Sequence, residues 1–581
     1  SYDWDRVIST SDPSYYKWTQ WIFKKLYEAG LAKQIDMPVN WCEELGTVLA
    51  NDEVIDGKSE RGGYPVVRKN MKQWIIDMPA YAEKLLNGLN ELDWPESTKE
   101  MQRNWIGKSE GVEVEFKIKD GGKFSIFTTC IETIYGITFM VLAPENELVD
   151  KLKDRIKNWD EVVKYREKTA KKSDFDRTEL NKIKSGVKLE GIFAINPVNG
   201  KEVPIVLGDF VLATYGTGAV MAVPSHDQRD FEYAKEHNLE MVEVISGGDT
   251  SVKAFEKGEY LGKGCKLINS EEFTGMTVEE AKEAITNKLE KEGIARRVNN
   301  YKMRDWIFSR QRFWGEPIPM IYCEKCGWQP MDEKDLPLLL PDVAEYEPTD
   351  TGESPLAKID SFVNTTCPKC GGPAKRETDT MPNWAGSSWY FLRFMDPHND
   401  KEFASMDAMK YWNRVDWYNG GMEHTARHLL YARFWVQFLY NIGLVPHKEM
   451  IWTRVSHGMV LGANNEKMSK SKGNVINPDD IVKEYGADTL RVYEMFMGDY
   501  EQDAPWSTDS LKGCKRFIDR IIRLKDKVVD GDEYSKNLET IIHQSIKKVT
   551  YDLSHIAYNT AVSTLMILLN KYEECESITK K

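Results

Sequence analysis

The sequence predicts a multidomain α/β protein in which one α/β domain is inserted into another and a helical bundle begins near the end. Three observations support this fold class. The 581 residues exceed what a single hydrophobic core organises. Segments with helical spacing and segments with strand alternation follow one another along most of the chain. Beyond Trp506 the apolar pattern is purely helical, with apolar residues stepping by three and four.

The composition is that of a folded protein. Hydrophobic residues make up 41% of the chain, and its 18 tryptophans argue against intrinsic disorder. The 78 basic and 92 acidic residues give a formal net charge of −14, which gives no hint of a nucleic-acid partner and does not exclude one. We find no apolar run of transmembrane length and no secretory signal, so we expect a cytoplasmic protein.

The first third of the chain changes from helical to strand character. Apolar residues recur near helical spacing over residues 14–34, and the segment 71–89 contains a second helix. Near Glu110 the pattern becomes alternating, with Gly121-Gly122 as a turn between two strands. We interpret the stretch from there to about Asn300 as the inserted α/β domain.

The middle of the chain returns to the main domain. Residues 304–323 have apolar strand character, and residues 423–444 form an apolar helical run. Residues 506–581 then read as helices alone. We find no internal repeat and no low-complexity segment.

Four cysteines form the strongest isolated motif. Cys323 and Cys326 make one CxxC pair, and Cys367 and Cys370 make a second, each followed by glycine that lets the backbone turn tightly. Four thiolates satisfy tetrahedral Zn²⁺ and leave no open position, so the site would be structural. The stretch between the pairs is longer than in a compact zinc ribbon. The alternative is four buried or redox-active cysteines.

Two polar clusters lie in the predicted inserted domain. The first holds Thr128, Thr129 and Thr133 at the end of an apparent strand, where hydroxyls can bind a ribose or position a water. Threonine is also simply a good strand residue. The second cluster follows a strand and a glycine-rich turn and consists of His226, Asp227 and Asp230. Its carboxylates could hold an ammonium group or merely cap the next helix.

A glycine pair precedes a cluster of polar residues at a helix start. Gly420 and Gly421 are followed by Glu423, His424 and His428, and the two histidines share one helix face. The zinc-protease motif requires glutamate directly after the first histidine, and that position is a threonine here. We therefore favour a ligand site at a helix N-terminus. A core or surface histidine is the alternative.

A lysine-rich loop follows that helix. Lys467, Lys470 and Lys472 are spaced by serines Ser469 and Ser471. Phosphoryl and nucleotidyl transfer need positive charge where negative charge develops on the leaving phosphate. The Walker fingerprint is absent, so the loop is not a P-loop. On composition alone, a solvated surface loop is the commoner outcome.

The string Lys467-Met468-Ser469-Lys470-Ser471 matches the second signature of the class I aminoacyl-tRNA synthetases letter for letter. Further stretches resemble leucyl-tRNA synthetases of the bacterial type over essentially the whole chain. They are "NWC" from Asn40, "MQRNWIGKSEG" from Met101, "YGTGAVMAVPSHDQRD" from Tyr215, "SRQRFWGEPIP" from Ser309, "SSWYFLRF" from Ser387 and "GGMEHTARHLLYARF" from Gly420.

This resemblance implies a Rossmann-type nucleotide-binding catalytic domain interrupted by an editing domain. The implied reaction converts leucine and ATP to leucyl-adenylate and pyrophosphate, then transfers leucine to tRNA(Leu), with Mg²⁺ accompanying ATP. The expected domains are the first catalytic part (1–110), the editing insertion (111–300), a return to the catalytic domain (301–322), the zinc-binding module (323–375), the second catalytic part with the lysine loop (376–505) and the start of an anticodon-binding-type helical bundle (506–581).

The resemblance also implies roles for individual residues. Lys470 would stabilise charge on the phosphates, with Lys467 in support. Asp3 and His424 would contact leucine. ATP and the adenylate would be bound by Gly420, Gly421, Glu423, His428, Met468, Ser469 and Ser471. Editing would use Thr128, Thr129, Thr133, Asp227 and Asp230, because a pocket distinguishes one methylene by only ~10–200-fold and close leucine analogues need a second, hydrolytic site.

The sequence departs from the family in two places. Cys130, Ile131 and Glu132 stand where the common form has Arg-Pro-Asp, which could change editing stringency. The partner signature His-Ile-Gly-His, which the resemblance places before residue 1, does not occur, and the end of the helical bundle is missing too. We therefore expect a protein truncated at both ends whose aminoacylation is weak or absent. The alternatives are a fragment that only edits and a non-catalytic tRNA-binding remnant. Family likeness suggests a monomer.

Overall fold

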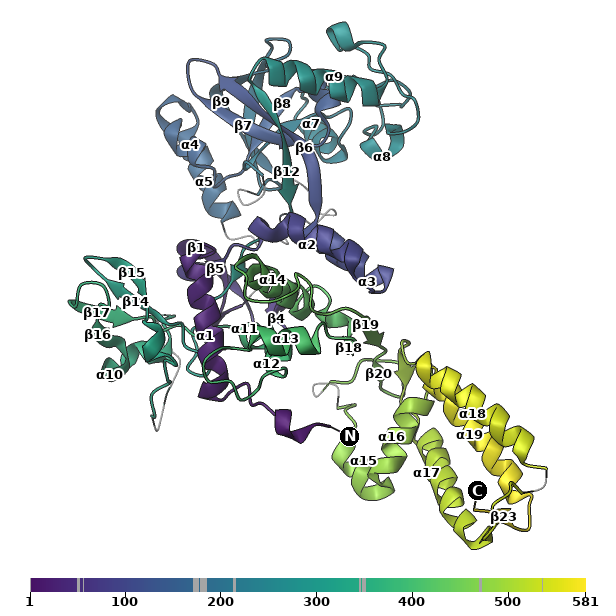
Figure 1. Cartoon of the computed structure of the whole chain (residues 1–581). Helices are drawn as coiled ribbons and strands as arrows, with labels where there is room; N and C mark the ends of the chain where they lie inside the picture. Colours follow the sequence, from purple (N-terminus) through teal and green to yellow (C-terminus); the bar gives the residue numbers. More distant parts are fainter. Residues whose placement is uncertain are drawn as a thin grey trace. The chain divides into compact units, whose positions relative to one another are not determined.

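The computed structural model describes residues 2–49, 53–55, 57–170, 177, 185–212, 216–343, 346, 352–469, 473–535 and 537–580 (Figure 1). The chain divides into two compact units. The first unit consists of Ser1–Leu86 and Arg103–Ala404, and the second of Asn87–Gln102 and Ser405–Lys581.

The first unit begins with helix α1 (Pro13–Glu28), whose N-terminus is capped by the Asp12 side chain. The helix ends at Glu28 rather than at residue 34, because Gly30 adopts a φ of +73° and the chain turns into a strand. That strand, β1 (Ala32–Cys42), pairs antiparallel with β5 (Val67–Ile76). The segment 71–89 is therefore half strand, and its helix is the short α2 (Ala82–Gly88).

The antiparallel sheet of the first unit has the order β13-β5-β1-β2. A separate two-stranded ladder joins β3 to β4. The remaining bounds here are β2 (Thr47–Leu49), β3 (Val54–Ile55), β4 (Lys58–Ser59), β13 (Trp306–Ile307), α11 (Asn383–Ser387) and α12 (Tyr390–Arg393). Helix α3 (Glu96–Ile106) is divided between the units, since Gln102 belongs to the second and Arg103 to the first. Within residues 304–323, the structure forms strands only at β13 and at Met320–Cys323 (β14), although the sequence predicts strand character for the whole stretch.

The inserted segment folds around a seven-stranded sheet of order β11-β8-β10-β9-β6-β12, with β7 pairing β6 (Figure 1). The predicted turn at Gly121-Gly122 is confirmed, because it lies between the antiparallel strands β6 and β7. The bounds are β6 (Lys108–Ile118), β7 (Lys123–Thr128), β8 (Phe139–Leu142), α4 (Glu147–Lys151), α5 (Trp159–Thr169), β9 (Gly186–Ile195), β10 (Glu202–Gly208), β11 (Ala219–Ala222), α7 (Gln228–Glu236), α8 (Lys257–Tyr260), α9 (Val278–Lys291) and β12 (Ala295–Tyr301).

The insertion is joined to the rest of its unit by adjacent strands. β6 and β12 pair antiparallel, so Lys108 at the entry lies opposite Tyr301 at the exit. Glu83 of α2 binds both ends. Its carboxylate accepts a hydrogen bond from the Tyr301 hydroxyl at 2.7 Å and lies 2.8 Å from Nζ of Lys108.

The cysteine module is a four-stranded antiparallel sheet of order β15-β14-β17-β16. Its elements are β14 (Met320–Cys323), β15 (Gly327–Pro330), α10 (Asp360–Val363), β16 (Asn364–Thr366) and β17 (Pro373–Arg376). The module has its own small core, which includes Ile321, Leu356 and Phe362.

The second unit holds a parallel β-α-β element. Strand β18 (Tyr418–Gly421) leads into helix α14 (His428–Asn441) and then into β19 (Arg454–His457), which pairs parallel with β18. Every residue of α14 from its start to Leu439 is buried, as expected for a crossover helix covered on all sides. Nearby elements are α13 (Met406–Trp412), β20 (Val460–Leu461) and β21 (Ala504–Pro505).

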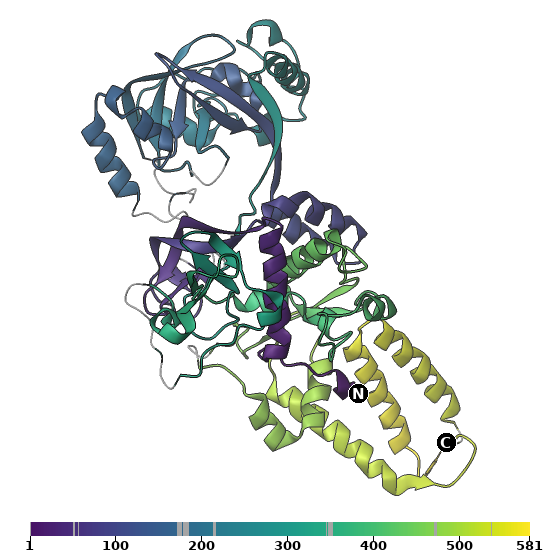
Figure 2. The same cartoon turned by 60° about the vertical axis from the view of Figure 1, so that its left-hand side comes forward.

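The final segment is helical, as predicted, apart from the short pair β22 (Val528–Val529) and β23 (Ile578–Thr579). Its helices are α17 (Thr508–Arg523), α18 (Glu539–Ser554) and α19 (Tyr558–Glu573), and α15 (Pro478–Tyr485) and α16 (Ala487–Phe496) precede it in the chain. α18 and α19 run side by side (Figure 2). The apolar residues Ile542, Ile546, Val549, Leu553 and Ile556 step by four and three along α18 and just past its end, a pattern that suits a bundle. Of these, Ile546 and Leu553 are exposed, whereas Ser545 and Asp552 of α18 are buried.

Candidate functional site

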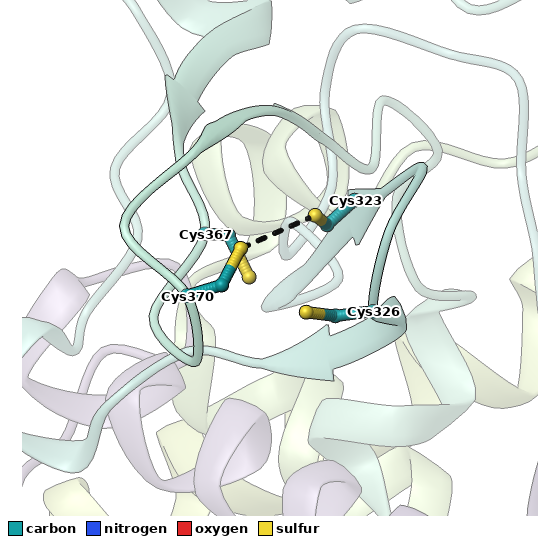
Figure 3. Close-up of side chains that lie close together, drawn as sticks. All are labelled: Cys323, Cys326, Cys367 and Cys370. Atoms are coloured by element: carbon teal, nitrogen blue, oxygen red, sulfur yellow. Dashed lines mark hydrogen bonds between the residues drawn. The ribbon is translucent and has the colours of Figure 1, made fainter.

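The four CxxC cysteines converge in the cysteine module (Figure 3). Their Sγ atoms all lie within 4.8 Å of one another, and those of Cys323 and Cys370 are 3.7 Å apart. Cys323 ends β14, and Cys367 precedes the turn to β17. The turns that follow the pairs use glycines with positive φ, +70° at Gly327 and +71° at Gly371. The predicted cysteine cluster is therefore formed by two matched knuckles.

The donor set fits a zinc ion. Burial of the Cys367 thiol opposes its ionisation, but backbone N–H groups of Cys370 and Lys369 lower its pKa to about 7. Four sulfur donors complete a tetrahedral shell, which leaves no position for a substrate. The cluster could thus bind zinc as a structural ion.

The threonine cluster lies where β7 ends. The Thr128 hydroxyl oxygen accepts a hydrogen bond from the Cys130 N–H at 3.0 Å, and the Thr133 hydroxyl donates to the Cys130 carbonyl at 2.8 Å. Nζ of Lys282 donates to the Thr129 carbonyl at 3.1 Å. Thr133 is only 1% exposed. These bonds fix the turn that follows the strand.

The residues that depart from the family pattern belong to the same turn. Glu132 is 1% exposed, and its Oε1 accepts a hydrogen bond from the Tyr260 hydroxyl at 3.0 Å. Burial raises the pKa of Glu132, with the hydrogen bond from Tyr260 opposing. Cys130 is half-buried beside Thr129, with Sγ and Oγ1 3.6 Å apart. The substituted residues are thus packed into the turn.

The second polar cluster follows β11, a strand that contacts β7. Asp227 caps helix α7 through Oδ1, which accepts from the N–H groups of Arg229 and Asp230. Oδ2 of Asp230 accepts from the Val223 N–H at 2.9 Å. Burial and then the charge of Asp227 raise the pKa of Asp230 well above its ordinary value. Asp227 therefore caps helix α7 and also forms a pair of neighbouring carboxylates with Asp230.

His226 is a structural member of that cluster. Its Nδ1 lies 3.1 Å from the Phe255 carbonyl and therefore donates, while Nε2 accepts from the Val244 N–H at 3.0 Å. Burial lowers the pKa of His226 to about 4, so the ring is neutral at physiological pH.

The glycine-rich strand end lies at the carboxyl end of parallel strand β18. An added Cβ at Gly421 would come within 2.1 Å of the Glu423 carboxylate, so the glycine provides the space that this side chain occupies. Glu423 and His424 are partly exposed, with Nε2 of His424 and Oε1 of Glu423 4.0 Å apart. In open parallel sheets this edge is where ligands bind.

His428 is held at the first turn of α14. Its Nε2 lies 2.6 Å from the Tyr418 hydroxyl. Burial lowers the pKa of His428 to about 4, helped by the neighbouring His424 ring and Arg454 guanidinium. Within the described part of the chain, neither of these histidines belongs to a group of three or more metal-ligating side chains.

Sequence reasoning missed two residues of this cluster. Tyr418 precedes the glycine pair and bonds His428. Arg454, at the start of β19, is 2% exposed and bonds carbonyls of β18. The available signal was a charged residue inside the apolar strand segment "IWTRVSH".

Asp3 and the residues of the lysine loop were also predicted to form the site. Asp3 lies in the first unit, where its carboxylate accepts from its own turn and from Nε of Arg6 at 3.1 Å, whereas His424 lies in the second unit. In the lysine loop, Lys467 is exposed, and the Ser469 N–H donates to Asn474 at 2.8 Å. Met468 is half-buried. Lys470 and Ser471 lie outside the described residues.

The first unit also contains a cavity of about 600 Å³ that none of the predicted site residues lines. Most of its wall is apolar, including Tyr16, Trp314 and Leu340. The carboxylate of Glu316 belongs to this wall and accepts from the Thr19 hydroxyl at 3.2 Å. Burial raises the pKa of Glu316 to about 8.

A class I aminoacyl-tRNA synthetase fold with an inserted editing domain accounts for these features. The family model for "tRNA synthetases class I (M)" matches residues 422–516, which contain Glu423, helix α14 and the lysine loop. The model for "Leucyl-tRNA synthetase, editing domain" matches residues 103–290, most of the insertion.

Comparison with a protein relative and with a solved structure identifies the family within the class I synthetases. The chain is 56% identical to a leucine–tRNA ligase of Alkaliphilus oremlandii (strain OhILAs) over 580 residues, which is all of this chain and 72% of that protein. A solved structure of the agnB2 LeuRS of Agrobacterium radiobacter K84, in a ternary complex with tRNA and LeuAMS, has a TM-score of 0.84 and 32% identity over 99% of this chain and 70% of its own. The chain belongs to the leucine–tRNA ligase family, so it is an aminoacyl-tRNA synthetase.

In the part of the chain that the structure describes, no helix is both long and apolar enough to cross a membrane.

Proposed function

We propose that this protein activates leucine with ATP and transfers it to tRNA(Leu) through the residues assembled at β18, and that its inserted domain hydrolyses mischarged tRNA. The observation that carries the proposal is the strand end itself. A glycine pair, an accessible carboxylate and a neutral histidine stand at the carboxyl edge of a parallel β-α-β element. The lysine loop belongs to the same unit.

In the activation step, Gly420 and Gly421 let the adenylate approach the backbone, and Glu423 accepts hydrogen bonds from its ribose hydroxyls. Neutral His428 can bind the nucleotide without adding charge. Lys467 and Lys470 place positive charge against the phosphates as pyrophosphate leaves, which stabilises the transition state more than the ground state. Met468, Ser469 and Ser471 shape that loop around ATP.

Leucine recognition is assigned to Asp3 and His424. A carboxylate pairs with the leucine ammonium, and the imidazole closes the side-chain pocket. Mg²⁺ would accompany ATP and neutralise phosphate charge. The four cysteines would hold Zn²⁺ as a structural ion that fixes the knuckles of the module.

Editing is assigned to the insertion. Asp230, with Asp227 beside it, holds the α-ammonium of the mischarged amino acid. Thr128, Thr129 and Thr133 present hydroxyl and backbone groups that position the ester and a water. The buried turn around Thr133 supports this division, because the hydroxyls of Thr128 and Thr133 are already hydrogen-bonded to the Cys130 backbone before any substrate binds.

Binding of tRNA is supported by a basic helix in an acidic protein. Helix α17 and the turn after it carry Lys512, Lys515, Arg516, Arg520, Arg523, Lys525 and Lys527. Such a stripe binds phosphates with a strong dependence on salt. We propose a cytoplasmic monomer. The domain borders drawn from the sequence stay a prediction, supported for the insertion by its family-model match.

The test is binding of a non-hydrolysable leucyl-adenylate analogue, measured by calorimetry. The protein should bind it, and Glu423→Gln should weaken binding roughly tenfold or more through the lost charge-assisted hydrogen bonds. The exposed Glu501 of the same unit, changed to glutamine, serves as the matched control and should leave the affinity unchanged. Equal affinity of the Glu423 variant and the control would contradict the proposed nucleotide site.

A further inference from the structure

Arg454 is a buried cation on β19, the strand that pairs with β18 and its terminal glycine pair. It stands opposite Tyr418 in the parallel register of β18 and β19 and is 2% exposed. Arginines this buried need several acceptors, because the guanidinium carries five N–H groups and a permanent charge. No carboxylate forms an ion pair with it among the described residues.

Its acceptors are backbone carbonyls, and most of them belong to β18. Nη2 donates to the carbonyls of Gly420 at 2.5 Å and Gly421 at 3.0 Å. Nη1 donates to the Tyr418 carbonyl at 3.3 Å and to that of Val455. A single planar group thus bonds three of the four residues of β18.

This arrangement compensates for a weakness of the strand. Gly420 and Gly421 have no side chains to pack, and glycine is the residue with most backbone freedom to lose. The Glu423 carboxylate rests directly on Gly421, so displacement of that glycine would displace the carboxylate. The positive charge of Arg454 also acts on Glu423 and lowers the pKa of His428.

We propose that Arg454 is a positioning residue for the adenylate site: its guanidinium fixes the Tyr418–Gly421 backbone and thereby sets the place of Glu423. The inference rests on the proposed function of that site. Arg454 contacts no substrate in this scheme and acts only through β18. Lysine is a poor substitute because its point charge lacks the planar fork that serves several carbonyls at once.

The experiment compares Arg454→Met and Arg454→Lys with Arg433→Lys. Arg433 is the matched control, since it is equally buried in the same unit but bonds Glu449 and Gln102 instead of β18. Amide hydrogen exchange is followed by mass spectrometry on a peptide spanning residues 417–424. The adenylate-analogue affinity is measured on the same samples.

Arg454→Met should speed exchange in that peptide by roughly tenfold and weaken analogue binding by a similar factor, and Arg454→Lys should recover part of both. Arg433→Lys should leave exchange in the peptide unchanged. Exchange within twofold of the unaltered protein in Arg454→Met overturns the inference, and so does an equal acceleration throughout the unit, which would mean general destabilisation. Failure of the unaltered protein to bind the analogue would instead contradict the proposed function, while the exchange comparison still decides the role of Arg454.

Discussion

The turn of the inserted domain and the end of β18 are two polar sites built in opposite ways. Around Thr133 the hydroxyls of Thr128 and Thr133 are buried and bond the Cys130 backbone, so the turn is complete without a ligand. At β18 the side chains of Glu423 and His424 are partly exposed, and the strand backbone is held in place by hydrogen bonds from buried Arg454. The first arrangement is preorganised through side chains, and the second leaves Glu423 and His424 open to ligand.

The largest expected effect would separate the two sites. Asp230→Asn should reduce release of norvaline from mischarged tRNA(Leu) by about a hundredfold or more, because the ammonium anchor is lost, and Thr133→Val should act similarly through loss of its hydroxyl. Affinity for the leucyl-adenylate analogue should stay within twofold in both variants. Measured release is compared with spontaneous hydrolysis. The assignment of editing to the inserted domain is wrong if norvaline release persists in both variants, or if release by the unaltered protein never exceeds spontaneous hydrolysis.

Metal removal should show whether the cysteine module is stabilised independently of the inserted domain. Treatment with a chelator, or Cys367→Ser, should release about one equivalent of zinc and lower the melting temperature, since structural zinc contributes folding free energy. Hydrogen exchange should accelerate in the cysteine module and remain unchanged in the inserted sheet. Carefully prepared protein without zinc would contradict the structural site.

Sequence alone predicted what is local. The turn at Gly121-Gly122 was found because glycine chemistry and alternation act over a few residues. The end of α1 was placed too late, because the apolar pattern continues past Gly30 into a strand. The apolar spacing along α18 suits a helix bundle, yet Ile546 and Leu553 of that pattern are exposed, whereas Ser545 and Asp552 of the same helix are buried.

The same distinction applies to the sites. The cysteines were paired correctly because their spacing carries the chemistry. Arg454 was missed because its acceptors on β18 are carbonyls more than thirty residues away, which no residue type reveals. The roles of the threonines, aspartates and lysines came from family likeness and stay predictions.

Acid and base should destabilise different regions. Burial raises the pKa of Glu316 from 4.5 to about 8, so the folded protein keeps a proton there that the unfolded chain has released, and stability should fall as pH rises through this window. Burial lowers the pKa of His226 from 6.5 to about 4, so in the inserted domain stability should fall as pH drops through that range. Glu316→Gln should reduce the fall of the melting temperature as pH rises from 4.5 to about 8. An unchanged fall over that window would show that Glu316 does not titrate there.

The smallest effect is expected at the linker between the insertion and its unit. Glu83→Gln removes the charge that pairs with Lys108 while keeping an acceptor for the Tyr301 hydroxyl. Because the pair is largely exposed, its loss should cost no more than about 1 kcal/mol of unfolding free energy, measured by urea denaturation. A larger loss would mean that the linker contributes to the stability of the whole unit.

The pairing of β6 with β12 also makes the inserted domain an exchangeable cassette. Chain entry and exit at Lys108 and Tyr301 are neighbouring strands, about 4.8 Å apart in the hydrogen-bonding direction. A short hairpin turn could close that gap without rethreading the polypeptide, so the segment could be deleted or replaced by a different domain as a unit. Evolution and protein engineering can therefore alter proofreading by recombination at one position, and the chain outside it needs no new connection.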